Sequence, residues 1–198
     1  AYCQHQGKIV GLFWVMRYQN GFLISFPNEL LEKIKSRLKM FVIISDVVIK
    51  DVSNDLFQFG LINDHKIDAY ILNDSLSVLI TESLNNTSEY FSDIEEWDKS
   101  YFDSLIPEVF AATSEKLVPQ MLNLDIDEIG VNFSKGCYPG QEVVARLHYL
   151  GSAKRRLFSF KANYEMQVGD ALYCATSKTA LARGNRYKGS GMVVSKVK

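Results

Sequence analysis

The sequence predicts an α+β fold, and its opening third carries the observations that predict it. Two β-rich runs, Lys8–Arg17 and Phe22–Phe26, flank an Asn20-Gly21 pair, which is the pattern of a β-hairpin. The segment Glu29–Met40 then places leucine and isoleucine at helical spacing with charged residues between them. Extended runs follow this helix. A hairpin, a helix and returning strands favour an α+β sandwich over a parallel, doubly wound sheet.

Local signals give the bounds of the elements that follow the hairpin. Asn28, directly after Pro27, is expected to be the N-cap of the first helix. Five further strands are expected from runs of β-branched and aromatic residues, at Phe41–Ile44, Val47–Val52, Leu56–Leu61, Ile67–Leu72 and Leu76–Thr81.

The middle of the chain predicts helices rather than strands. Asn85–Ser88 is a polar loop, and Ile94–Phe102 has the pattern of a helix with acidic residues at its start, as the helix dipole favours. The pattern weakens between residues 107 and 134, where Asn123–Ile129 is expected to form a short helix. A further helix is expected to begin near Gln141, because Val143, Val144 and Leu147 would then share one face.

The composition changes after Gly151, which predicts a domain boundary near residue 150. Three short strand candidates follow, divided by glycine and polar turns: Arg156–Lys161, Ala171–Cys174 and Gly191–Val197. We therefore expect an α+β domain over residues 1–150 and a small antiparallel β-barrel-like domain over residues 151–198. The second domain is short for a complete barrel.

Composition excludes several classes of partner. The 198 residues carry a formal net charge of −1, so no basic face is expected for direct binding of nucleic acid. The longest apolar runs are far below the ~20 residues of a membrane span, and no signal-peptide pattern opens the chain. Three widely spaced cysteines without CxxC or Cys/His clusters argue against disulfides and zinc. We expect a cytoplasmic protein without a metal site.

One eight-residue segment carries most of the chemical information, and we call it the signature loop: Lys135-Gly136-Cys137-Tyr138-Pro139-Gly140-Gln141-Glu142. Its glycines and proline predict a tight turn before the helix that begins near Gln141. Cys137 would then lie beside free backbone N–H groups and close to Lys135, and both surroundings favour thiolate over thiol. The alternative is that Cys137 is a small buried hydrophobe and that the glycines only turn the chain.

The signature loop matches a known pattern at every defined position. Lys135–Glu142 follows K-G-C-Y-x-G-Q-E, and on this basis the chain resembles the YgfZ family, folate-binding relatives of the glycine-cleavage aminomethyltransferase. Four other places extend the resemblance over most of the chain: Gln6–Ile9, Lys39–Val47, Val118–Leu124 and Arg156.

The resemblance implies a fold, a cofactor and a role. It implies ferredoxin-like subdomains of the aminomethyltransferase (T-protein) type, a C-terminal β-barrel and a tetrahydrofolate site. It also implies support of iron–sulfur enzymes, including tRNA-modifying and possible tRNA-thiomethylating clients. Cys137 and Lys135 are the expected catalytic residues. The expected cofactor-binding residues are Trp97, Tyr138, Gln141, Glu142 and Arg146.

Trp97 has two readings. It lies in a segment similar to the one in which the family's tryptophan contacts folate, and a flat pterin ring suits an aromatic face. The other reading is packing of an amphipathic helix, and this chain has Leu105 where the family usually places glycine. Trp14, in an apolar run, is expected to belong to the core.

The resemblance also separates the candidate functions. At Gly11 and Leu12 this chain lacks the aspartates of the aminomethyltransferase, so the matching acid–base chemistry has no residue to perform it. We therefore disfavour glycine cleavage. Three hypotheses stay open: a folate-binding accessory protein that uses Cys137 for iron–sulfur enzymes, a folate-dependent one-carbon transferase with another base, and a non-catalytic folate-bound interaction module. The variant Cys137→Ser separates the first from the last.

Overall fold

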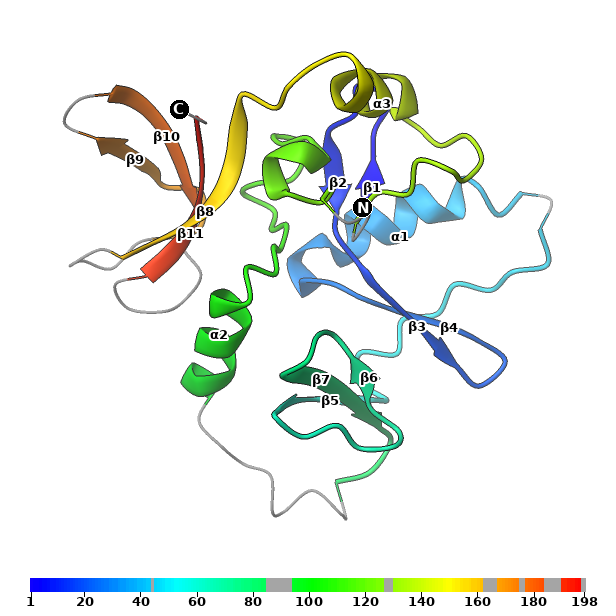
Figure 1. The fold of residues 1–198 in the computed structure, drawn as a ribbon. Helices are drawn as coiled ribbons and strands as arrows, with labels where there is room; N and C mark the ends of the chain where they lie inside the picture. Colours follow the sequence, from blue (N-terminus) through cyan, green and yellow to red (C-terminus); the bar gives the residue numbers. More distant parts are fainter. Residues whose placement is uncertain are drawn as a thin grey trace.

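The computed structural model describes residues 1–43, 45–84, 94–126, 130–161, 167–174, 177–183 and 190–196. Figure 1 shows short antiparallel sheets and helices joined by long connections. The strands are β1 (Tyr2–Cys3), β2 (Ile9–Gly11), β3 (Trp14–Tyr18), β4 (Gly21–Ser25), β5 (Phe57–Ile62), β6 (Tyr70–Ile71), β7 (Leu76–Thr81), β8 (Arg155–Lys161), β9 (Ala171–Cys174), β10 (Ser177–Arg183) and β11 (Ser190–Lys196). The helices are α1 (Leu31–Lys39), α2 (Ile94–Asp103) and α3 (Gln141–Tyr149), with 3₁₀ turns η1 (Asn28–Leu30) and η2 (Pro119–Leu122).

The predicted hairpin is confirmed, with a different turn. In the β3–β4 pair Trp14 lies opposite Ser25, and Tyr18 lies opposite Gly21. The two residues of the loop are therefore Gln19 and Asn20 rather than Asn20 and Gly21. Gln19 adopts a φ of 47° to close it. The run that begins at Lys8 is interrupted after Gly11, because β2 leaves this ribbon and pairs with β1.

The first helix is also confirmed, but its start differs. Asn28 is the first residue of the 3₁₀ turn η1, and the N-cap of α1 is Leu30, which makes no side-chain cap hydrogen bond. The helix is held instead through two basic side chains one turn apart. Lys33 and Arg37 both bind the carboxylate of Glu115, at 2.9 and 2.7 Å. The buried side chain of Ile34, next to Lys33 in the sequence, packs α1 against the core.

The two strands expected after α1 are wrong. Residues 41–43 form a turn and bend, and 46–52 run without strand pairing. Val48 is 88% exposed and Ile43 is 83% exposed. A strand needs a neighbour for its backbone groups, and the described part of this segment has none. β-branched residues therefore produced the pattern of a strand where only extended chain is found.

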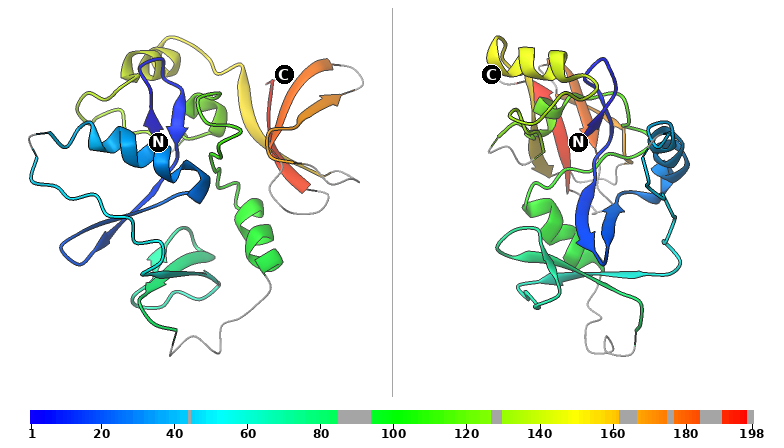
Figure 2. Two further views of the ribbon diagram at one scale, coloured as in Figure 1. Left: turned by 180° about the vertical axis from the view of Figure 1, so that it is seen from behind. Right: turned by 90° about the vertical axis from the view of Figure 1, so that its right-hand side faces the viewer.

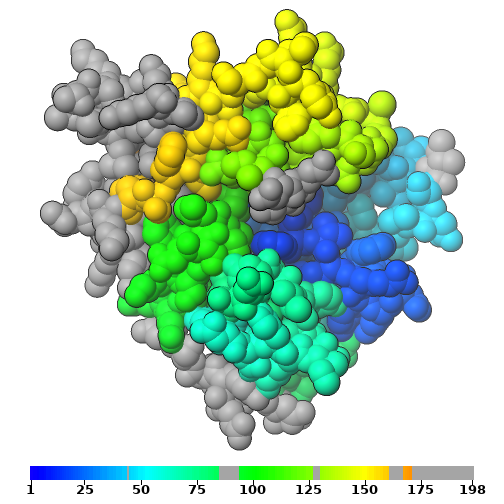
Figure 3. All heavy atoms as spheres, viewed as in Figure 1, coloured from blue at the N-terminus to red at the C-terminus, as the bar shows by residue number. Residues whose placement is uncertain are grey.

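The next sheet was largely predicted. β5, β7 and β6 form an antiparallel sheet in the order β5-β7-β6, with β7 at its predicted bounds and β6 shorter than expected. The helix α2 lies beside β5 in Figures 1 and 3. The predicted loop Asn85–Ser88 lies outside the described residues.

The second half departs from prediction at η2. The helical turn covers Pro119–Leu122, earlier than the expected Asn123–Ile129, and Asn123 ends it with a φ of 59°. Residues 127–129 lie outside the described residues. Proline at the first position starts the turn, and asparagine tolerates the left-handed conformation that ends it. The helix α3 begins at Gln141, as expected.

The C-terminal strands form one antiparallel sheet in the order β8-β11-β10-β9. The strand β10 was not predicted. Among the described strands no pairing joins β8 to β9, so the predicted barrel is not confirmed. The sheet lies to one side of the molecule in the left view of Figure 2.

The main hydrophobic core joins segments that are distant in the sequence. It contains β1 and β2 residues, α1, the stretch from Val109 to Leu124, α3 and Leu157 of β8. Each fully buried leucine or isoleucine contributes on the order of 1.5–3 kcal/mol. In the part of the chain that the structure describes, no helix is long and apolar enough to span a bilayer.

Candidate functional site

The signature loop is an exposed turn that leads into α3. Cys137 is exposed and carries a free thiol. The turn closes with a hydrogen bond from the N–H of Gln141 to the C=O of Tyr138, at 3.1 Å. Gly140 is the N-cap of α3 with a φ of 82° and offers no side-chain cap. The alternative reading, in which Cys137 is a buried hydrophobe, is therefore wrong.

Two glycines bring the signature loop against the turn between β1 and β2. A Cβ at Gly140 would lie 2.3 Å from the carbonyl oxygen of Gln4 and 2.7 Å from the backbone of Gly7. A Cβ at Gly7, whose φ is 74°, would lie 3.0 Å from Cβ of Val143. This contact joins two segments that carry the family resemblance, Gln6–Ile9 and Lys135–Glu142. Figures 1 and 2 show α3 beside the β1–β2 turn.

The groups beside Cys137 are an ammonium and a phenol. Nζ of Lys135 lies 4.7 Å from the centre of the Tyr138 ring, a cation–π contact. The hydroxyl of Tyr138 is buried, and burial raises the pKa of this phenol. Asn132 fixes the entry to the loop, since its Oδ1 accepts from the N–H of Lys135 at 2.9 Å. Burial also raises the pKa of the thiol of Cys3, which is only 5% exposed.

The remaining predicted residues of this region lie on α3. Gln141 is half-buried at its first position, while Glu142 and Arg146 are exposed. Val144 is the fully buried contact of α3 with the core, whereas Val143 is 41% exposed. The signature loop and α3 thus present a thiol, an amide, a carboxylate and a guanidinium on one end of the molecule.

Trp97 belongs to a second centre, which we call the aromatic cluster: Trp14, Trp97 and Tyr101. The Trp97 indole lies on the backbone of β5, since a Cβ at Gly60 would be 2.2 Å from its Cε3. The rings of Trp97 and Tyr101 have centroids 5.7 Å apart. Nε1 of Trp14 donates to the Tyr101 hydroxyl at 3.0 Å. Trp14, expected in the core, is half-buried.

A carboxyl group adjoins the aromatic cluster. Burial, and then the charge of Asp98, raise the pKa of Glu108 to about 6. Burial and the charge of Glu108 in turn raise the pKa of Tyr101. Sequence reasoning missed Tyr101 and Glu108. The spacing of Trp97 and Tyr101, one helical turn apart, was the available signal for the tyrosine, whereas nothing local marks Glu108.

The two centres lie apart. In Figure 3, α2 and the β5–β7 sheet occupy one end of the visible face, and α3 occupies the other. The structure therefore brings together Lys135, Cys137, Tyr138 and the α3 residues, and it places Trp97 elsewhere. Among the described residues, no group of three His, Cys, Asp or Glu side chains could hold a metal ion.

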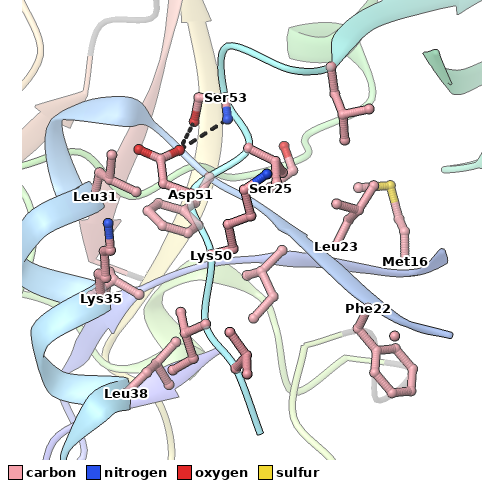
Figure 4. A pocket seen from close by; sticks show the side chains of 18 of the residues that line it. Met16, Phe22, Leu23, Ser25, Leu31, Lys35, Leu38, Lys50, Asp51 and Ser53 are labelled. Atoms are coloured by element: carbon pink, nitrogen blue, oxygen red, sulfur yellow. Dashed lines mark hydrogen bonds between the residues drawn. The ribbon is translucent and has the colours of Figure 1, made fainter. Parts of the chain in front are cut away.

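A groove of about 790 Å³ lies between α1, β4 and the segment 46–53. Figure 4 shows Leu31, Lys35 and Leu38 on one side of it and Leu23 and Met16 on the other. Both the N–H and the hydroxyl of Ser53 donate to Asp51, which shapes the extended segment along its rim. The groove is mainly apolar and lies along β4.

The positions Gly11 and Leu12, where the resemblance leads us to expect the aspartates of an aminomethyltransferase, are apolar here. Gly11 is buried in β2, and a Cβ there would lie 2.7 Å from the Phe13 ring and 3.0 Å from Ile34. Leu12 packs against the same core. No side chain fits at Gly11 without displacing these neighbours.

Comparison with known proteins gives an uncharacterized relative and several that are described as tRNA-modifying protein YgfZ. No family model matches the chain. It is 29% identical to a Haemophilus influenzae protein described as uncharacterized, over 85% of this chain and 61% of that protein. It is 29% identical to the tRNA-modifying protein YgfZ of Colwellia psychrerythraea, over 83% of this chain and 60% of that protein. It is 33% identical to the tRNA-modifying protein YgfZ of Blochmanniella pennsylvanica, over 61% of this chain and 36% of that protein. The chain spans about three fifths of the length of the first two relatives.

Proposed function

This chain belongs to the YgfZ family, and from this premise we propose that it supports tRNA modification as a folate-binding accessory protein. Its role is to assist the assembly or repair of iron–sulfur enzymes, including those that modify tRNA, through Cys137. The observation that carries the proposal is the signature loop, which presents an exposed thiol at the start of α3.

The loop has the properties that thiol chemistry on a partner requires. A cysteine that serves another protein has to be accessible, and Cys137 is exposed whereas Cys3 is buried. Its backbone is held from both sides, by Asn132 before it and by the close contact of Gly140 with Gly7 after it. A thiolate in such a place can ligate iron or take part in disulfide exchange. Lys135 supplies positive charge to the loop.

The residues of the aromatic cluster fit a reduced folate. The indole of Trp97 is half-buried and lies flat against Gly60, which suits stacking on a pterin ring. A carboxylate suits the amino and N–H donors along the edge of a pterin, and Glu108 is close enough to the cluster for its charge to act on Tyr101. When bound, a reduced folate supplies one-carbon or redox chemistry. Trp97 would form one wall of the folate site, and Glu108 would accept hydrogen bonds from the edge of the pterin ring.

Aminomethyl transfer of the glycine-cleavage type is disfavoured. Its aspartates correspond to Gly11 and Leu12, and the tight packing around Gly11 leaves no room for a carboxylate. The nearest acidic residue downstream of Lys8 is Glu29, whose carboxylate accepts from the N–H of Ala111. Binding of folate without aminomethyl turnover is the expected behaviour, since ground-state binding alone does not accelerate a chemical step.

Calorimetric titration with tetrahydrofolate tests the folate half of the proposal. Trp97→Ala should weaken binding by about 1–3 kcal/mol, the usual effect of losing a buried aromatic contact. Phe22→Ala is the matched control, because Phe22 is an aromatic residue, 70% exposed, that lines the groove instead. Unchanged affinity for tetrahydrofolate in Trp97→Ala, together with weakened affinity in Phe22→Ala, would indicate that folate binds in the groove instead.

The iron–sulfur half is tested in cells that lack their own family member. Wild-type protein should restore the activity of iron–sulfur enzymes, and Cys137→Ser should not. Full restoration by Cys137→Ser would favour the non-catalytic interaction module.

A further inference from the structure

The 3₁₀ turn η2 connects the helix of the signature loop to the C-terminal sheet through two side-chain amides. Gln120 is 1% exposed, and its Nε2 donates to the C=O of Val144 in α3 at 2.8 Å. Asn123, which ends the turn, donates through Nδ2 to the C=O of Leu157 in β8 at 3.1 Å. Neither centre described above uses these residues, although they lie in the segment Val118–Leu124 that carries part of the family resemblance.

β8 returns a contact to the same turn. Nη1 of Arg156 donates to the C=O of Gln120 at 3.0 Å, and its Nη2 donates to Asp125 at 3.0 Å. The side chain of Asp125 is 7% exposed, so the carboxylate of this ion pair is largely buried. His148 of α3 lies 3.9 Å from the same carboxylate. The turn η2 is thus tied to α3 and to β8 at once.

The amide of Gln120 is directional, and packing alone does not account for it. The orientation of the amide is set by its partner, because the carbonyl oxygen of Val144 can only accept. In the described part of the chain Oε1 of Gln120 is buried without a hydrogen-bond partner. Burying such a group is costly, and methionine would fill the same space without that cost. The glutamine is therefore best explained by the bond that it makes to α3.

That bond reaches the signature loop through one residue. The C=O of Val144 accepts from Gln120, and the N–H of Val144 donates to the C=O of Gly140 at 3.2 Å. We infer that Gln120 is a positioning residue for the signature loop. Its side chain holds α3 and thereby keeps Cys137 in place just before the start of this helix. The inference rests on the proposed function for the importance of Cys137, but its structural part can be tested without it.

The test uses a trifluoromethyl label on Cys137 in the full chain, with the site of labelling verified by peptide mapping. Gln120→Met keeps the volume and removes the donor. The ¹⁹F resonance should then shift or broaden. Amide exchange in α3 should accelerate by about fivefold, the factor that corresponds to one neutral hydrogen bond of about 1 kcal/mol. Val78→Ala is the control, since Val78 is buried in β7, outside the main core. It should lower stability and leave the resonance unchanged.

Gln120→Glu gives a signature that a purely structural role does not. A protonated glutamic acid can donate to the C=O of Val144, whereas an ionised one opposes it, and burial raises the pKa of the introduced carboxyl. The ¹⁹F resonance should be native at low pH and perturbed as the pH rises, with Gln120→Met perturbed throughout. The charged and titratable groups described around η2 are Asp125, Arg156 and His148, so the wild-type protein is titrated in parallel.

Two results would overturn the inference: a wild-type resonance in Gln120→Met, or an equal change in Val78→Ala. Restoration of iron–sulfur enzyme activity in cells is measured separately. If wild-type protein fails to restore it, the proposed function fails, while the ¹⁹F result still decides whether Gln120 positions the loop.

Discussion

Replacing Gly140 by alanine tests whether the signature loop depends on its contact with the β1–β2 turn. The backbone at Gly140 has a φ of 82°, and an L residue in the left-handed region costs about 1–2 kcal/mol. The new Cβ would also lie 2.3 Å from the Gln4 oxygen and 2.7 Å from the backbone of Gly7. These are main-chain atoms, so the contact can be relieved only by moving the loop or the turn.

The strain and the displaced contact together should lower the free energy of unfolding by roughly 2–4 kcal/mol. Urea unfolding followed by circular dichroism measures this change. Gly136→Ala is the matched control in the same loop, because a Cβ at Gly136 meets nothing within 4 Å and its φ is not in the positive range. That variant should unfold within about 0.5 kcal/mol of wild type, as surface substitutions usually do.

The comparison is decisive because both glycines lie in the signature loop, but only Gly140 contacts the β1–β2 turn. Wild-type stability in Gly140→Ala would show that the signature loop does not rest on the Gln4–Gly7 turn. An equal loss in Gly136→Ala would show that the loop is sensitive to any side chain, and the reasoning from the close contact would fail.

Three further predictions follow from the buried groups. Cys137 should be alkylated at neutral pH much faster than Cys3, which is buried and whose pKa is raised, and peptide mapping that finds equal labelling of the two would contradict this. Arg156→Met should cost about 3 kcal/mol in urea unfolding, because it leaves the buried Asp125 without its ion pair, and Lys50→Met, which removes an exposed pair, should cost less than about 1 kcal/mol. The pKa of Glu108 is raised to about 6 in the folded protein, so the folded protein binds the proton more tightly than the unfolded chain does. Between pH 4.5 and 6 the free energy of unfolding of wild type should therefore fall by roughly 1–2 kcal/mol relative to that of Glu108→Gln. Parallel profiles of stability against pH for the two proteins would contradict the burial of this carboxyl.

The sequence predicted those parts of the fold in which local pattern and tertiary packing agree. The helix around Ile34, the helix that contains Trp97, the start of α3 and the strand β7 all combine a regular apolar pattern with a buried face. The segment 46–52 failed because its β-branched residues give the same pattern whether or not a neighbouring strand exists. The order of the C-terminal strands could not be predicted, since it depends on pairing between segments that are distant in the sequence.

The candidate site divides in the same way. Glycines, a proline and the helix pattern around Cys137 were sufficient to predict a tight loop at a helix start, whereas the exposure of Cys137 comes from the structure. The contact of Gly140 with Gly7, the aromatic cluster and the role of Gln120 all depend on residues brought together from distant segments. Glu108 is the clearest example, because only its surroundings in the fold, Tyr101 and Asp98, give it an unusual pKa.

The proposed role of Cys137 is tested most directly in cells that lack their own family member and carry this protein. The activity of iron–sulfur enzymes and the level of tRNA modification are measured for wild type, Cys137→Ala and Gly136→Ala, with equal expression verified by immunoblotting. Wild type and Gly136→Ala should restore both quantities, and Cys137→Ala should restore neither. Full restoration by Cys137→Ala would contradict the proposal that this thiol carries the function.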